Sequence, residues 1–361
     1  ETGEIIPLNS VGDGQYDCED FSDECSYNKS IIDQPYLSVI SWIIGVPATL
    51  FNIIIFVRSI TQLGDCVCPS KFLNRLMILL ISLGDLMVGL YLIVLSIVNI
   101  FHKDTYCRER FTWLTSGYCA AMGVVSSTGS QISLFAMVVL SLGRFMTVGR
   151  VGPGGNGSKR YKCIAMLLVV VVLLASFLIS YLPLLDKLED VFVNGLYYDK
   201  RIKLFIGAPS KQKHIAILEQ YYSKFRGNPD LPWSTVRRLV RNMFSQNYGG
   251  VNGVKLHFYG NDGVCLFKFF VTPDDPQAFY SITVLFLDLL CFIIIVVSYA
   301  LIYSVSLSST RQLKGKRNGV TNLSMQRKLT MIIVTDFFCW VPFITMSALH
   351  YLGTVDASPW Y

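Results

Sequence analysis

The sequence has little charge and few histidines. Of its 361 residues, 16% are charged and 52% are hydrophobic, and the mean hydropathy is +0.46. An ordinary soluble core does not shelter so many apolar side chains, so the composition favours a membrane protein. The sequence also lacks a nucleophile motif, and its histidines lack the spacing of metal ligands, which argues against a membrane enzyme. The histidines are His102, His214, His257 and His350.

Long apolar runs dominate what is present. A membrane-spanning helix needs ~20 largely apolar residues, because lipid offers no partner for an unpaired backbone N–H or C=O. Six runs reach that length and predict an all-α membrane bundle: Tyr36–Phe56, Leu73–Ile100, Tyr118–Val148, Cys163–Pro183, Phe279–Val305 and Leu329–Leu352. There is no seventh run, no initiator Met and no secretory leader, so we expect this to be a fragment of a longer precursor.

The short loops after the first, third and fifth runs are rich in Lys and Arg, and Asp65 is the only acid among them. Basic short loops stay in the cytoplasm. The pattern therefore predicts a multi-pass plasma-membrane protein. Its N-terminus and the long connection 184–278 are both expected to lie outside the cell.

The outer segments differ in charge and pattern. Residues 1–34 form an acidic tail ahead of the bundle at 35–361, whereas the connection 184–278 is basic. The tail and the connection either dock against each other or remain two separate solvated surfaces. Apolar residues recur at helical spacing over 209–225 and 232–244, which predicts two short amphipathic helices forming a lid.

The ten cysteines are predicted to lie outside, at the cytoplasmic face or within the apolar runs. Disulfides persist outside the cell. A bond between Cys119, which opens the third run, and Cys265, ahead of the fifth, would fasten the long connection over the bundle. Five outer cysteines leave one over after any pairing, and Cys107 is the favoured orphan. The outer cysteines are Cys18, Cys25, Cys107, Cys119 and Cys265.

Polar residues inside the runs are hard to explain by packing alone, because an ionisable group in a membrane helix usually serves function. We expect Asp85 to be the only carboxylate buried inside the apolar runs. The motifs are "ATLFNIIIF" with Asn52, "ISLGDLMVG" with Asp85, "SLGRFMTVG" with Arg144, "VVSYALIYSV" with Tyr299, and "TDFFCWVP" with Trp340 and Pro342.

In order and spacing, these motifs resemble the rhodopsin-like G-protein-coupled receptors. "TDFFCWVP", together with "NDGVCLF" around Cys265, is similar to the branch with leucine-rich-repeat ectodomains. Within that branch, Trp340 favours the relaxin-receptor and invertebrate members over the glycoprotein-hormone receptors. The resemblance implies a rhodopsin-like helical bundle that passes an extracellular peptide or protein signal to a heterotrimeric G protein.

The resemblance also assigns roles to residues of the polar core. Asn52 and Asp85 match that core, and Asp85 with Ser133 resembles a sodium site; the alternative is a neutral Asp that hydrogen-bonds neighbouring helices. Tyr299 matches a tyrosine that stabilises the active state, or else it is an interfacial anchor.

Two further matches concern the cytoplasmic half of the bundle. Trp340 with Pro342 matches the switch of the sixth helix, or else Pro342 makes a plain kink. Arg144 matches the arginine that faces the G protein, but Gly143 replaces the preceding acid and Asn322 the second acid. We therefore expect raised basal activity.

The acidic tail carries a resemblance of its own. "DGQYDCEDFSDEC" is similar to the last third of an LDL-receptor class A module, which implies a calcium site; the alternative is a disordered tail closed by a Cys18–Cys25 disulfide. "NKS" makes Asn28 an outside glycosylation acceptor. The implied calcium ligands are Asp13, Asp17, Asp23 and Glu24.

A transporter or channel is the alternative function. The sequence has no internal repeat and no pair of broken helices, and it offers a single convincing buried carboxylate. Internal repeats and paired broken helices are typical of transporter cores. Because the sequence lacks them, the receptor is favoured.

Overall fold

The computed structural model describes ten stretches of the chain. They cover residues 35–63, 69–102, 112–149, 158–192, 194–199, 204–208, 253–260, 264–271, 277–312 and 344–352. The predicted calcium ligands, Cys18, Cys25, Cys107, Asn28, Trp340, Pro342 and both lid helices lie outside these stretches.

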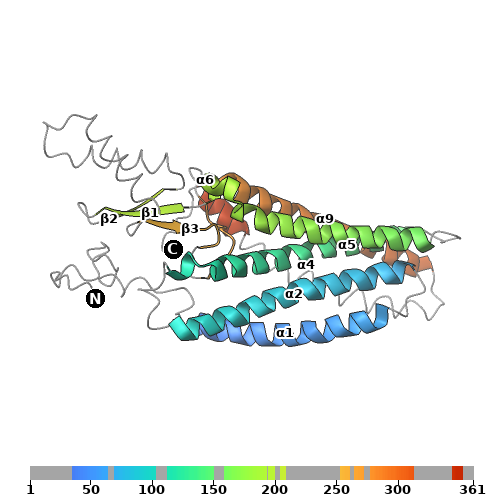
Figure 1. Ribbon diagram of the computed structural model, residues 1–361. Coiled ribbons are helices and arrows are strands. Elements are labelled where there is room, and N and C mark those ends of the chain that lie inside the picture. Colours follow the sequence, from blue (N-terminus) through green and yellow to red (C-terminus); the bar gives the residue numbers. More distant parts are fainter. Residues whose placement is uncertain are drawn as a thin grey trace, which may run out of the picture.

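Five long helices run side by side in the described part of the chain (Figure 1). Each contains a segment long and apolar enough to cross a membrane. The prediction of a helical membrane bundle is confirmed, and of the sixth run the structure describes the end, with a helix over residues 344–351. The five helices are α1 (Pro35–Leu63), α2 (Pro69–His102), α4 (Gly117–Gly149), α5 (Ser158–Tyr181) and α9 (Ala278–Gln312).

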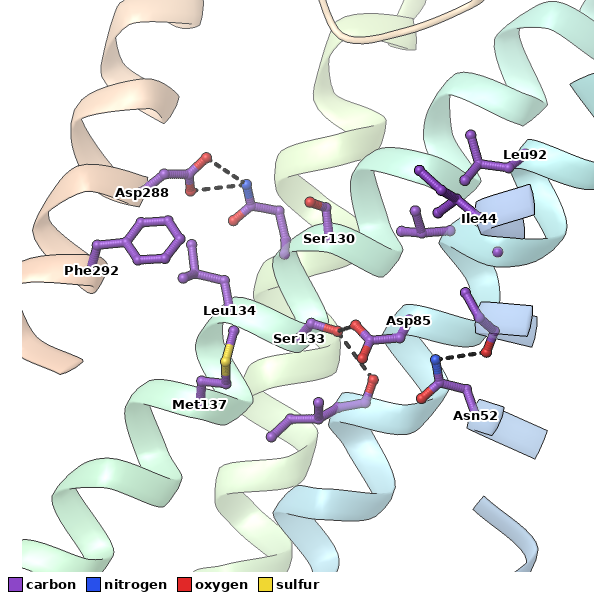
Figure 2. Close-up of a pocket in the computed structure, with 15 residues that line it drawn as sticks. Ile44, Asn52, Asp85, Leu92, Ser130, Ser133, Leu134, Met137, Asp288 and Phe292 are labelled. Carbon is purple, nitrogen blue, oxygen red and sulfur yellow. Dashed lines mark hydrogen bonds between the residues drawn. The ribbon is translucent and has the colours of Figure 1, made fainter. Parts of the chain in front are cut away.

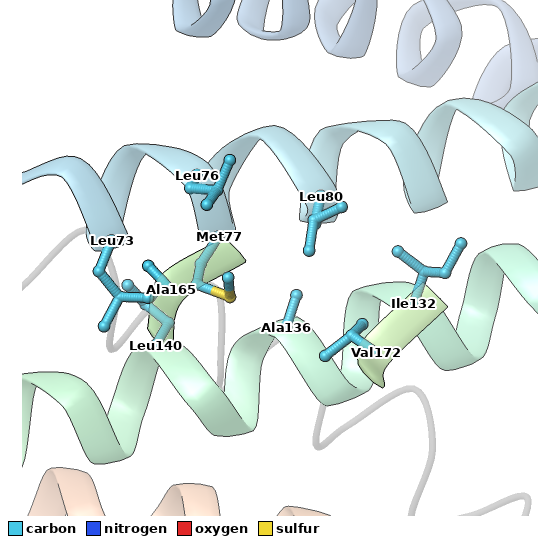
Figure 3. Close-up of a cluster of buried hydrophobic side chains, with 9 residues drawn as sticks. All are labelled: Leu73, Leu76, Met77, Leu80, Ile132, Ala136, Leu140, Ala165 and Val172. Carbon is cyan, nitrogen blue, oxygen red and sulfur yellow. The ribbon is translucent and has the colours of Figure 1, made fainter. Parts of the chain in front are cut away.

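Helix α4 is the hub of the bundle. It packs against α2, α5 and α9, while α1 packs on the outer side of α2. The main apolar core joins α2, α4 and α5, and Figure 3 shows its side chains interdigitating between the three helices. Leu and Ile side chains elsewhere on the helices are exposed, as expected for surfaces that face lipid. The core residues are Leu73, Leu76, Met77, Leu80, Ile132, Ala136, Leu140, Ala165 and Val172.

Glycines bring α2 and α4 unusually close. A Cβ added at Gly84 would lie 2.4 Å from the carbonyl oxygen of Gly129, and a Cβ added at Gly129 would lie 2.7 Å from the carbonyl oxygen of Gly84. Small residues at a crossing let two backbones approach without a side chain between them. This contact is one residue away from Asp85, so it fixes the height at which that carboxylate meets α4.

The connection after α5 contains strands that the sequence analysis did not predict. Two 3-10 turns, Leu182–Leu184 and Asp186–Leu188, lead into the short helix α6 (Glu189–Phe192). The strands β1 (Asn194–Asp199), β2 (Leu204–Ala208) and β3 (Gly253–Leu256) follow. They form an antiparallel sheet in the order β2-β1-β3. Runs of four to six residues are too short for periodicity to distinguish strand from helix.

The register of the sheet brings distant parts of the connection together. Leu196 on β1 lies opposite Gly207 on β2 and opposite Val254 on β3. The sheet lies at one end of the bundle (Figure 1). We call this the sheet end, and the end of α4 that carries Arg144 the arginine end.

Candidate functional site

The docking segment, made of residues 256–260 and 264–271, packs onto the helices at the sheet end. Its aromatic rings form a buried cluster with rings from α6 and α9. Tyr259 is fully buried, and its hydroxyl donates a hydrogen bond of 2.6 Å to the carbonyl oxygen of Ser180. Burial raises the pKa of the Tyr259 phenol above its usual value, so the hydroxyl remains a donor. The cluster comprises Phe192, Phe258, Tyr259, Phe267 and Tyr280.

Gly123 on α4 leaves space for the Tyr259 ring. A Cβ added at Gly123 would lie 2.3 Å from Cγ of Tyr259. The ring therefore rests directly on the α4 backbone. The docking segment is thus fitted to the helices beneath it.

Covalent and polar links hold the same segment at three further places. Cys119 at the start of α4 is joined to Cys265 by a disulfide. The Tyr91 hydroxyl of α2 donates to the carbonyl oxygen of Val264 at 2.5 Å. Ser347 donates to the carbonyl oxygen of Phe269, also at 2.5 Å. These links tie the segment to α2, to α4 and to the helix over residues 344–351.

A cavity of about 340 Å³, lined by apolar side chains and a few polar ones, lies among the helices (Figure 2). Asp85 and Ser133, which the sequence analysis paired, both line it. The Ser133 hydroxyl donates to Oδ1 of Asp85 at 2.6 Å, and it lies 3.1 Å from the carbonyl oxygen of Ile81. Asn52 lines the same cavity, and its amide donates to the carbonyl oxygen of Ala48 at 3.0 Å. The structure therefore brings three of the predicted polar residues to one space.

A second carboxylate in this cavity was missed. Asp288 of α9 is 4% exposed and lines the cavity together with Gln131 of α4. Gln131 Nε2 lies 3.0 Å from Oδ1 and 3.3 Å from Oδ2 of Asp288, and donates to the carboxylate. The expectation that Asp85 is the only buried carboxylate is wrong. The signal was present, because Asp288 is an isolated acid inside the apolar run "VLFLDLLCF".

Arg144 and Tyr299 meet towards the arginine end. The Arg144 guanidinium on α4 lies close to the Tyr299 hydroxyl on α9. Nε of Arg144 is buried and has no hydrogen-bond partner among the described residues. The neighbouring Gly143 is buried too, and a Cβ there would lie 3.1 Å from Cδ2 of Leu73. The Arg144 side chain thus extends from α4 towards α9, and its Nε–H group remains without an acceptor among the described residues.

Helices α4 and α9 are therefore joined by polar contacts at two levels. Gln131 with Asp288 forms one contact, and Arg144 with Tyr299 forms the other, roughly 16 to 20 Å further along the helices. A shift of α9 along α4 must alter both contacts. Within the described ranges, no group of three or more His, Cys, Asp or Glu is placed to hold a metal ion.

Comparison with known proteins gives a family model and several similar receptors. Residues 240–359 match the family model described as "7 transmembrane receptor (rhodopsin family)". The chain is 25% identical over 338 residues to the G-protein coupled receptor GRL101 of Lymnaea stagnalis, which covers 93% of the chain and 24% of the relative. It is 19% identical over 345 residues to relaxin receptor 1 of Homo sapiens, covering 93% of the chain and 35% of the relative.

A third relative matches over a shorter stretch. The follicle-stimulating hormone receptor of Equus asinus is 28% identical over 120 residues, 33% of the chain and 17% of the relative. The chain spans about a quarter of the length of the Lymnaea receptor and about a third of the relaxin receptors. All three relatives are named as receptors.

Proposed function

We propose that the chain is the membrane bundle of a rhodopsin-family G-protein-coupled receptor. An extracellular signal, carried by a peptide or protein, shifts the populations of two helix arrangements, and a heterotrimeric G protein binds one of them at the arginine end. This mechanism needs no catalysis, only a ligand with different affinities for the two arrangements. The matches to receptors over most of the chain support this assignment.

The observation that carries the proposal is the contact between Arg144 and Tyr299. It joins α4 to α9 at the end of the bundle opposite the disulfide. A charged group that is only partly satisfied by its own bundle is suited to a partner that docks there. With the sheet end outside the plasma membrane, as the short basic loops predict, the arginine end faces the cytoplasm.

The same orientation suggests how a signal enters. The docking segment is linked to four helices, so a ligand that moves this segment from outside would act on those helices through the disulfide and the hydrogen bonds. The acidic tail, with its implied calcium site and the glycosylation site at Asn28, lies ahead of the bundle in the chain. We propose that both belong to the extracellular part of the receptor.

Asp85 and Ser133 are the proposed sodium site. Their hydrogen bond holds α2 to α4 inside the cavity, and the carboxylate keeps one oxygen available for an ion. A bound cation would lower the cost of a charged Asp85 in low dielectric. Because the bound cation would favour the inactive helix arrangement, it would oppose signalling.

Guanine-nucleotide exchange tests the proposal. The full-length receptor in nanodiscs is mixed with heterotrimeric G proteins, and exchange of GDP for GTP is measured for wild type and for Arg144→Ala. We expect the variant to lose most of its exchange activity, at least tenfold, because the arginine contacts the G protein. Arg58→Ala is the matched control, since Arg58 is an exposed arginine on α1, and it should exchange as wild type does.

Two results would contradict the receptor assignment. The first is equal exchange by wild type and Arg144→Ala with every G-protein class. The second is solute or ion flux through wild-type vesicles, which would favour the transporter instead. The second buried carboxylate removes one argument against a transporter, so the flux measurement belongs with the exchange assay.

A further inference from the structure

Asp288 is a buried acid to which neither the sequence motifs nor the proposed sodium site assigns a role. It lies across the cavity from Asp85 (Figure 2). We propose that Asp288 and Gln131 form a binding site for a small monovalent cation, separate from the pair of Asp85 and Ser133. The site joins α4 to α9, whereas Asp85 and Ser133 join α2 to α4.

The first argument is charge. A carboxylate removed from water is strongly disfavoured unless a counter-charge or a set of donors replaces the water. Asp288 receives its hydrogen bonds from the neutral amide of Gln131, and the described part of the chain supplies no basic side chain beside it. Its electrostatic neighbours are Tyr280 and Cys291, which carry no positive charge. An ionised Asp288 would therefore have no compensating positive charge among the described residues.

Arg144 cannot provide the missing charge. It is thirteen residues further along α4 than Gln131, which places it roughly 20 Å away along the helix. Its guanidinium is engaged with Tyr299. The Asp288 carboxylate lines the cavity, so a counter-ion held in that cavity would lie beside it.

The second argument is independent and concerns the amide oxygen. Gln131 is 5% exposed, it lines the cavity, and its Oε1 has no hydrogen-bond partner among the described residues. A buried acceptor without a partner is costly. A cation placed between Oε1 and the Asp288 carboxylate would satisfy both, because hard cations prefer oxygen ligands.

The composition of the site selects the charge of the ion. One carboxylate and one neutral amide oxygen carry a single negative charge, which a monovalent cation neutralises. Divalent ions need more oxygen ligands and usually more than one carboxylate.

A neutral pair is the rival explanation. If Asp288 is protonated and the Gln131 amide is rotated by half a turn, the acid donates to Oε1 and no ion is needed. The two explanations differ in one observable, because only the ion site makes stability depend on the cation present.

Thermal unfolding in sodium tests the site. The full-length receptor in detergent is unfolded in sodium chloride and in choline chloride at equal ionic strength, with tryptophan fluorescence as the readout. The measurement is made in the Asp85→Asn background, so that the proposed sodium site cannot contribute. We expect sodium to raise Tm by about 2–6 °C in Asp85→Asn and to have no effect in Asp85→Asn with Asp288→Asn. A Tm that does not depend on sodium in Asp85→Asn would overturn the proposal.

A variant that should strengthen sodium binding tests the site without relying on a loss that misfolding could also cause. Gln131→Glu adds a second carboxylate beside Asp288 and should lower the half-saturating sodium concentration at least tenfold; an unchanged value would overturn the proposal. Asp186→Asn is the matched control because Asp186 is an exposed carboxylate, and it should leave the sodium response unchanged. These stability measurements need no G protein, so their outcome is separate from that of the exchange assay.

Discussion

At the scale of the residue, Gly143 decides how firmly Arg144 is held. An acid next to the arginine would pair with it by a charge-assisted hydrogen bond, which typically contributes about 1.5–3 kcal/mol. Here the arginine is adjacent to glycine and lies close to the neutral phenol of Tyr299. We predict that Gly143→Glu lowers basal guanine-nucleotide exchange several-fold without loss of cell-surface expression.

Gly143→Gln is the control for that substitution. It has the same size as Glu and must displace the same Leu73 methyl group, which would lie 3.1 Å from the new Cβ. Only the charge differs between the two variants. If both lower basal exchange equally, packing against Leu73 and not pairing with Arg144 explains the effect.

The polar residues show how far the sequence alone could lead. The pairing of Asp85 with Ser133 came from the order of motifs along the chain, because residues 48 positions apart carry no local signal of contact. Asp288 and Gln131 are 157 positions apart and match no motif. An acid inside an apolar run could have been marked as functional, but its partner depends on how α4 and α9 are rotated, which the sequence does not reveal.

At the scale of the element, the contact between Gly84 and Gly129 sets the spacing of α2 and α4. We predict that Gly84→Ala destabilises the bundle by about 1–3 kcal/mol, because its Cβ would meet a rigid carbonyl at 2.4 Å and the Ser133 hydroxyl at 2.5 Å. It should also weaken sodium binding at Asp85. Thermal unfolding, with and without sodium, measures both effects.

The control for this prediction is Gly117→Ala at the start of α4. A Cβ there has no neighbour within 4 Å, so Tm should change little. A Gly84→Ala variant as stable as Gly117→Ala would mean that the helices separate at little cost.

Elements differed in how well the sequence predicted them. The long apolar runs predicted α1, α2, α4, α5 and α9, since lipid leaves a spanning segment no alternative to the helix except a closed barrel. The sheet after α6 was not predicted. β1 pairs with β3 across more than fifty residues of chain, and such pairing is fixed by tertiary contacts that short strands do not encode locally.

At the scale of the whole molecule, the disulfide between Cys119 and Cys265 links the long connection to the bundle. It closes a loop of 146 residues, and a cross-link over so long a loop typically contributes about 2–5 kcal/mol. We predict that reduction lowers Tm of the wild-type receptor by roughly 5–15 °C, because the docking segment then loses its covalent link to α4. The double variant Cys119→Ala with Cys265→Ala should start from the lower Tm and show no response to reductant. Cys163→Ser, which removes an exposed free thiol, should respond as wild type does. A double variant that reductant still destabilises would show that the stabilising bond lies elsewhere in the chain.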